Sequence, residues 1–222
     1  MRRSQAQTPF GNLEAMTKKV LLLLADGFEP LEAAGFTDVF GWAAIDGKEP
    51  VELVSTGFKP VLRATFGFSV MPQAQISEVD LNEFDALAIP GGFAGAGFYD
   101  EAMSEPFLNV IRHFEARDQD IASVCVASLA LGAAGALNGR RATTYHQVGG
   151  KRKDQLEQYG ALFVDQAVVE DGRMISSTGP GTAVEVALRL LANITSQENA
   201  AHIRAKMRVP ELDRSWLHRP QV

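Results

Sequence analysis

One cysteine is the first candidate for chemistry in this chain of 222 residues. Cys125 follows the short apolar run 120–124, which is typical of a buried strand, and precedes the small and leucine side chains of 126–134, which favour a buried helix. A sulfur on such a turn would lie at a helix N-terminus, where partial positive charge lowers the pKa of a thiol. Cys125 is therefore a candidate nucleophile, although free cysteines often serve only as small apolar side chains.

Two glutamates follow another apolar run and could act on that sulfur. Glu29 and Glu32 come after residues 20–24, at the start of a predicted helix over 31–45. A carboxyl group facing a thiolate in a dry pocket should have a raised pKa, because burial and like charge both disfavour its ionised form. We take Glu32 as the candidate acid and Glu29 as its rival; both could instead only stabilise the N-terminus of their helix.

A glycine pair follows the buried strand predicted at 86–89. Gly91 and Gly92 come directly after Pro90, and their missing side chains let the backbone approach a ligand closely. With the N–H of Val126, these amides could form an oxyanion hole for negative charge on a substrate oxygen. The alternative interpretation is an ordinary turn that ends the strand.

His146 is the histidine best placed to join this group. It lies 21 residues after Cys125, next to Tyr145, on a segment that returns to the sheet. It could act as a general base or ion-pair partner for the sulfur, or it could be a surface histidine. No histidine and carboxylate spacing resembles a metal site, so we expect neither a metal nor a cofactor.

The elements that must position these residues alternate along the chain. Strands are predicted at 20–24, 51–55, 86–89, 120–124 and 161–164. Helices are predicted at 31–45, 104–117, 126–134, 149–159, 183–193 and 197–208, and hairpins in 57–71 and 168–176. This order predicts an α/β fold with a parallel sheet covered by helices on both faces. Sites in such sheets form at the C-terminal ends of strands, where the candidate residues fall.

Composition and charge limit the function classes. The net charge of −6 argues against a nucleic-acid partner, and the longest apolar run is too short to span a membrane. A single cysteine allows no internal disulfide, and the N-terminus resembles no secretory signal, so we expect a cytoplasmic protein. We expect one domain over 18–194, a flexible extension at 1–17, and a C-terminal helix and tail at 195–222. The basic run 151–153 is interpreted as a solvated face.

Four motifs together resemble the ThiJ/PfpI family of the class I glutamine amidotransferase-like superfamily. They lie at 22–32, 88–92, 122–125 and 177–182, and the resemblance extends from Lys18 to Asn193. It implies a flavodoxin-like three-layer sandwich with a mostly parallel central sheet, a nucleophile elbow and a homodimer or larger assembly. It also implies that Cys125 is the elbow nucleophile, that Glu32 rather than Glu29 is the acid, and that Gly92 and Val126 supply the oxyanion amides.

The branches of this family carry different residues around the cysteine, the acid and the histidine, and this chain departs from each branch at one or more of these positions. Peptidase-like members often carry His after the cysteine, where this chain has Val126, so an intracellular peptidase is disfavoured. Members similar to isonitrile hydratase resemble 123–144 well but usually carry Thr after the cysteine and Asp in the acid region. The carbonyl-detoxifying branch uses Glu, Cys and His, and places its His where Tyr145 stands here.

Three functions remain open from the sequence. The leading hypothesis is a cysteine-dependent hydrolase or lyase of the glyoxalase or deglycase type, which acts on a small electrophile such as an α-oxoaldehyde. A hydro-lyase similar to isonitrile hydratase is the nearest enzymatic alternative. The third is a non-catalytic redox sensor or stress chaperone in which Cys125 forms sulfenic or sulfinic acid stabilised by Glu32.

Overall fold

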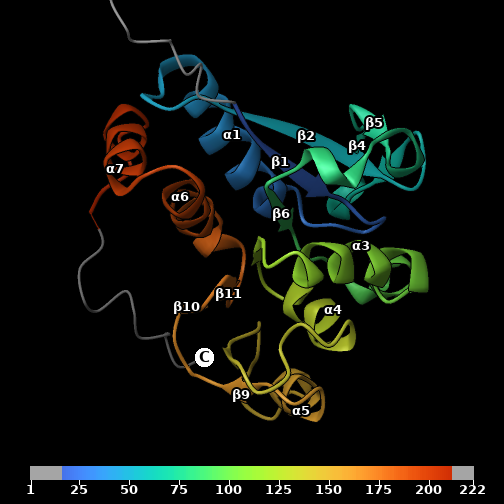
Figure 1. Ribbon diagram of the computed structural model, residues 1–222. Helices are drawn as coiled ribbons and strands as arrows, with labels where there is room; N and C mark the ends of the chain where they lie inside the picture. The colour runs from blue at the N-terminus through green and yellow to red at the C-terminus, as the bar shows by residue number, and fades with distance from the viewer. Residues whose placement is uncertain (1–16, 212–222) are drawn as a thin grey trace, which may run out of the picture.

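The computed structural model describes residues 17–211 and contains a seven-stranded sheet between helices (Figure 1). The strand order is β10-β11-β7-β6-β1-β2-β5. The bounds are Lys18–Leu23 for β1, Val51–Gly57 for β2, Ala74–Gln75 for β5, Ala86–Ile89 for β6, Asp120–Ser123 for β7, Val168–Asp171 for β10 and Met174–Ser177 for β11. All neighbours pair in parallel except β10 and β11, which form the predicted hairpin.

Helices cover both faces of this sheet. Helices α1, α6 and α7 pack together on one side, and α3 and α4 lie on the other (Figure 1). The bounds are Pro30–Asp46 for α1, Phe98–Ala102 for α2, Glu105–Ala116 for α3, Ala127–Ala133 for α4, Arg152–Gln158 for α5, Ala183–Ile194 for α6 and Gln197–Lys206 for α7. The predicted flavodoxin-like three-layer sandwich is therefore confirmed.

The central strands are apolar because both of their faces are buried. Residues 20–23 of β1 and all of β6 have no exposed surface, as expected for parallel strands between two helical layers. The carboxyl ends of β1, β6 and β7 therefore meet at one edge of the sheet, since these strands are adjacent and parallel.

Two small sheets lie outside the main one. Strands β3 (Leu62–Arg63) and β4 (Ser69–Val70) form the hairpin expected within 57–71. Strand β9 (Leu162–Phe163) pairs in parallel with β8 (Arg141–Ala142). The strand predicted at 161–164 therefore exists, but it does not join the main sheet. Single 3₁₀ turns occur at Thr65–Gly67, Ile76–Glu78, Leu81–Glu83, Ala94–Ala96 and Pro180–Thr182.

The C-terminal helix α7 packs against α6 and the end of α1. Its Asn199 is fully buried and donates a hydrogen bond to the carbonyl of Glu49 at 2.9 Å, while His202 contacts the carbonyl of Asp46. The predicted extension lies outside the described residues except for Thr17, and so does the tail beyond residue 211. None of the helices within 17–211 is long and apolar enough to cross a membrane.

Candidate active site

Cys125 occupies a strained turn between β7 and α4. Its φ of 59° lies in the left-handed region, which residues with a side chain rarely adopt. Three hydrogen bonds hold it there: its N–H donates to the carbonyl of Ser177 at 3.0 Å, and its carbonyl accepts from the hydroxyls of Ser128 at 3.1 Å and Thr144 at 3.2 Å. The chain therefore holds the sulfur at the sheet edge in the strand-to-helix turn that the sequence predicts.

Glu32 lies beside this turn, in the first turn of α1. Its side chain is almost completely buried, with 1% exposure, and its Oε2 accepts the N–H of Gly91 at 2.6 Å. Its Oε1 has no hydrogen-bond donor among residues 17–211. Burial raises the pKa of Glu32 to about 8, although the hydrogen bond from Gly91 and the interaction with Cys125 oppose this shift. The expected raised pKa of this carboxyl group is therefore present.

Glu29 takes a different position from Glu32. It is also buried, and its carboxylate accepts the Thr65 hydroxyl at 3.4 Å. Burial raises the pKa of Glu29, and its charge acts weakly on both Glu32 and Cys125. Glu32 is the glutamate that interacts directly with the sulfur, so the structure favours it over its rival.

The thiol itself differs from the sequence-based expectation of a lowered pKa. Burial raises the pKa of the Cys125 thiol well above its ordinary value, and the charge of Glu32 raises it further, while the N–H of Val126 lowers it. The helix α4 has only seven residues, and its positive end does not outweigh removal from water. Because a charge on either group opposes ionisation of the other, Cys125 and Glu32 titrate as a pair.

The three amides proposed for an oxyanion hole have separate roles. The N–H of Gly91 is occupied by Glu32, and the N–H of Val126 is directed at the sulfur of Cys125. No acceptor within residues 17–211 engages the N–H of Gly92. Gly91 also permits the close approach, because a Cβ there would lie 2.9 Å from the carbonyl of Val124. Gly91 thus positions Glu32, and Gly92 alone keeps an unused donor.

A cavity of about 540 Å³ opens above Cys125. It is large enough for a small molecule. Its wall combines residues from the ends of β6 and β7 with the segment that precedes α5: Glu32, Gly92, Phe93, Ala94, Gly95, Tyr99, Cys125, Val126, Tyr145, Gln147, Gly150, Lys151, Arg152 and Pro180. Cys125 is 8% exposed, and that exposure falls within this cavity.

His146 is not among the residues that line the cavity. Its ring lies edge-on to Phe163 at 4.7 Å, and its Nε2 lies 3.5 Å from Asp165. The side chain that faces the cavity from this segment is Tyr145, whose hydroxyl accepts a hydrogen bond from Gln147 at 2.8 Å. The segment therefore turns His146 toward the β8–β9 sheet, and the structure does not bring it to the sulfur.

Sequence reasoning missed four polar residues of the cavity wall, one of which is Gln147, next to His146. Lys151 and Arg152 belong to the basic run that we interpreted as a solvated face, and Tyr99 lies on α2. The guanidinium of Arg152 lies 4.5 Å from the centre of the Tyr99 ring. The charge of the 151–153 run was the available signal, but its distance from Cys125 in the sequence concealed the contact.

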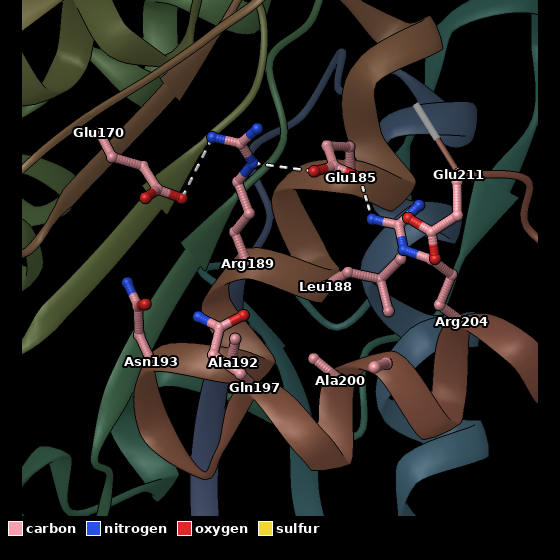
Figure 2. A pocket seen from close by; sticks show the side chains of 11 residues that line it. Glu170, Glu185, Leu188, Arg189, Ala192, Asn193, Gln197, Ala200, Arg204 and Glu211 are labelled. Atoms are coloured by element: carbon pink, nitrogen blue, oxygen red, sulfur yellow. Dashed lines mark hydrogen bonds and ion pairs between the residues drawn. The ribbon is translucent and has the colours of Figure 1, made fainter. Parts of the chain in front are cut away.

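A second cavity, of about 360 Å³, lies between α6, α7 and β10 (Figure 2). Its guanidinium groups are already paired with acids. Arg189 contacts Glu170 at 3.4 Å and Glu185 at 2.9 Å, and Arg204 pairs with Glu185 (Figure 2). This cavity therefore offers a network that ties α7 to α6, and no unpaired guanidinium group for a ligand.

Comparison with known proteins agrees with this architecture. The model of the DJ-1/PfpI family matches residues 18–193, and this chain belongs to that family. The protein DJ-1beta of Drosophila melanogaster is 29% identical over 190 residues, which cover 85% of this chain and 95% of its own. Its crystal structure superposes with a TM-score of 0.78 and 26% identity, and covers 88% of this chain and 100% of its own.

Two further relatives carry names that describe activities. A deglycase of Pyrococcus abyssi is 31% identical over 163 residues, which cover 73% of this chain and 91% of its own. An isonitrile hydratase of Pseudomonas putida is 31% identical over 195 residues, which cover 86% of this chain and 78% of its own. The chain is thus similar to proteins named for more than one reaction type.

Proposed function

We propose that the chain is a cysteine-dependent enzyme that acts on small electrophilic carbonyl compounds, with an α-oxoaldehyde as the substrate class and water as the second reactant. The observation that supports this most strongly is the pairing of Cys125, at the base of a cavity, with a buried carboxyl oxygen of Glu32 that has no other partner. Similarity to a deglycase supports the same substrate class.

In the first step, the sulfur of Cys125 attacks the aldehyde carbon. A C–S bond forms, the carbonyl π electrons move to oxygen, and that oxygen takes up the proton that leaves the thiol. The N–H of Gly92 can donate to this oxygen while its charge develops. The thiol proton passes through the carboxyl of Glu32, whose pKa of about 8 lies near the operating pH of a general acid or base.

In the following steps, Glu32 acts first as a base and then as an acid. It removes the hydrogen on the former aldehyde carbon as a proton, which leaves an enediolate, and returns that proton to the neighbouring carbon. The hydroxyl proton on the former aldehyde carbon moves to the oxygen of the neighbouring carbon. The product is a thioester of a 2-hydroxy acid. Water then attacks the thioester carbon, the C–S bond breaks, and the sulfur regains its proton. The sum is addition of one water to the α-oxoaldehyde.

The second candidate reaction is hydration of an isonitrile, which similarity to the Pseudomonas putida enzyme favours. The sulfur would add to the terminal isonitrile carbon, and Glu32 would deliver a proton to that carbon. Water would then attack the same carbon, the C–S bond would break, and an N-substituted formamide would leave. Cys125 and Glu32 keep the same roles in both reactions, so the substrate is what separates them.

A substrate panel tests the proposal. Purified protein is incubated with methylglyoxal, an isonitrile and a peptide, and lactate, formamide and cleaved peptide are measured. We expect lactate from methylglyoxal; formamide alone would select the second reaction. Formation of sulfinic acid on Cys125 with peroxide, and no turnover of any compound, would replace both enzymes with the redox sensor. A cysteine that must stay reduced to act requires a reducing compartment, so we also propose a cytoplasmic location.

We further propose that two copies of the chain associate through the β3–β4 hairpin. Phe66 and Phe68 of this hairpin and Met71 directly after it are exposed, and Leu31 at the start of α1 is exposed as well. Large apolar side chains gathered on one surface favour a protein partner. Light scattering should give twice the chain mass, and Phe66→Ser with Met71→Ser should give a monomer. A monomer already in the unmodified protein would contradict the association.

A further inference from the structure

Two cations line the Cys125 cavity, Lys151 and Arg152. Neither Lys151 nor Arg152 has a carboxylate at ion-pair distance within residues 17–211, and the only hydrogen bond of the Arg152 side chain is to Gln155 at 2.9 Å. In the second cavity, by contrast, Arg189 and Arg204 are both paired with glutamates (Figure 2). The wall around Cys125 therefore presents positive charge that the protein does not neutralise.

Tyr99 adds a hydrogen-bond donor to this wall. Its hydroxyl is buried and has no partner among the residues that the structure describes. A buried polar group without a partner costs free energy unless a ligand or water satisfies it. Burial raises the pKa of Tyr99 to about 12, so the hydroxyl keeps its proton and can only gain by donating it to an acceptor.

The two side chains are held together. The guanidinium of Arg152 lies over the Tyr99 ring at 4.5 Å from its centre, a cation–π geometry that fixes its direction. Tyr99 feels the charges of both Arg152 and Cys125, which places the phenol within electrostatic reach of both. A guanidinium fork beside a phenol hydroxyl is suited to the two oxygens of a carboxylate.

We propose that Arg152, Tyr99 and Lys151 form a subsite for a carboxylate group of the substrate. This inference rests on the proposed function, because it places the electrophilic carbon of the same molecule at Cys125. The substrate class becomes carbonyl electrophiles that also carry a carboxylate. A neutral electrophile of the same size lacks the group that satisfies the Tyr99 hydroxyl and the Arg152 charge, so the site discriminates against it.

Two alkylating agents of nearly equal size test the subsite without requiring turnover. Iodoacetate carries a carboxylate and iodoacetamide a neutral amide, and Cys125 is the only cysteine in the chain. We measure the ratio of their rates at Cys125 and divide it by the same ratio for glutathione at equal pH and salt. A charge-assisted hydrogen bond predicts that this selectivity exceeds that of glutathione by about tenfold.

Three variants assign the effect to the subsite. Arg152→Met should reduce the selectivity to that of glutathione, and Tyr99→Phe, which keeps the ring under the guanidinium, should reduce it in part. Lys153→Met is the matched control, because it removes one positive charge from the same helix at a residue that does not line the cavity. Lys153→Met should leave the selectivity unchanged. If Arg152→Met does not fold, as judged by circular dichroism, Tyr99→Phe decides.

The outcomes separate this inference from the proposed function. A selectivity equal to that of glutathione in the unmodified protein, or an equal loss in Lys153→Met and Arg152→Met, would overturn the subsite. If the selectivity is high but no compound of the substrate panel is turned over, the subsite stands and the proposed reaction does not. If methylglyoxal is turned over and the selectivity is ordinary, only the subsite is removed.

Discussion

Replacement of Cys125 by serine should lower turnover by about 10³-fold or more, because the chain then lacks its nucleophile. A serine hydroxyl at this position is as buried as the thiol but far harder to ionise, since burial already raises the pKa of the sulfur. The substitution removes little volume and leaves the backbone hydrogen bonds of the turn in place, so the fold should persist. The measurement is the rate of lactate formation from methylglyoxal.

Ser123→Ala is the matched control for this variant. Ser123 is buried in β7, and its hydroxyl donates to the carbonyl of Ile175 at 3.2 Å, away from the cavity lining. We expect this variant to keep most of the activity while losing some stability. Turnover by Cys125→Ser within tenfold of the unmodified rate would show that the reaction does not pass through the sulfur.

Replacement of Glu32 by glutamine should stabilise the protein at alkaline pH. The pKa of this carboxyl is about 8 in the folded chain and about 4.3 in an unfolded one. At low pH both states bind the proton and Glu32 costs nothing. As the pH rises past about 4.3, the unfolded chain loses the proton first, so stability falls until about pH 8. Each unit of pKa difference corresponds to about 1.4 kcal/mol, which gives a penalty on the order of 5 kcal/mol above pH 8.

Urea unfolding at several values of pH between 4 and 9 measures this penalty. The free energy of unfolding of Glu32→Gln should exceed that of the unmodified protein by several kcal/mol at pH 9, and the difference should disappear near pH 4. Glu29→Gln provides the comparison, because Glu29 is also buried but accepts the Thr65 hydroxyl. It should show a smaller effect. If the free energy of unfolding changed with pH in the same way in Glu32→Gln and in the unmodified protein, ionisation of Glu32 in the folded chain would cost no stability, which would contradict the prediction.

The sequence predicted the scaffold of the site well, because local signals determine it. The runs 86–89 and 120–124 lie in strands that are buried on both faces, and the alternation of strands and helices defines the sandwich. Cys125 was correctly placed on a strand-to-helix turn, since an apolar run that ends at a small-residue helix leaves few alternatives. Glu32 was chosen over Glu29 by family resemblance, and no local signal separates the two.

The remainder of the site depends on the path of one irregular segment. Residues 143–151 follow no periodic pattern, so the sequence could not show that Tyr145 faces the cavity while His146 turns toward Phe163. The helix that follows it carries Arg152 to Tyr99, a contact between residues about 50 positions apart, and Lys151 lines the same cavity. Side-chain direction in such a segment is decided by packing against distant elements.

The ionisation of the Cys125 thiol shows a different limit of prediction from sequence. A helix N-terminus predicts a lowered pKa for Cys125, but the strength of that effect competes with burial, which only a three-dimensional structure provides. In this chain α4 has seven residues, and the carboxyl of Glu32 adds a second opposing influence. The sequence therefore pointed to two groups that the structure places together, Cys125 and Glu32, but not to the balance between the effects that set the thiol pKa.

The alkylation rate of Cys125 as a function of pH is the most direct test of that balance. In the unmodified protein, the rate with iodoacetamide should rise only above the ordinary titration range of a thiol. Glu32→Gln should move the midpoint to lower pH, because the amide cannot carry the charge that opposes ionisation of the sulfur. A midpoint below the ordinary range that rises in Glu32→Gln would contradict this account and show that Glu32 stabilises a resting thiolate.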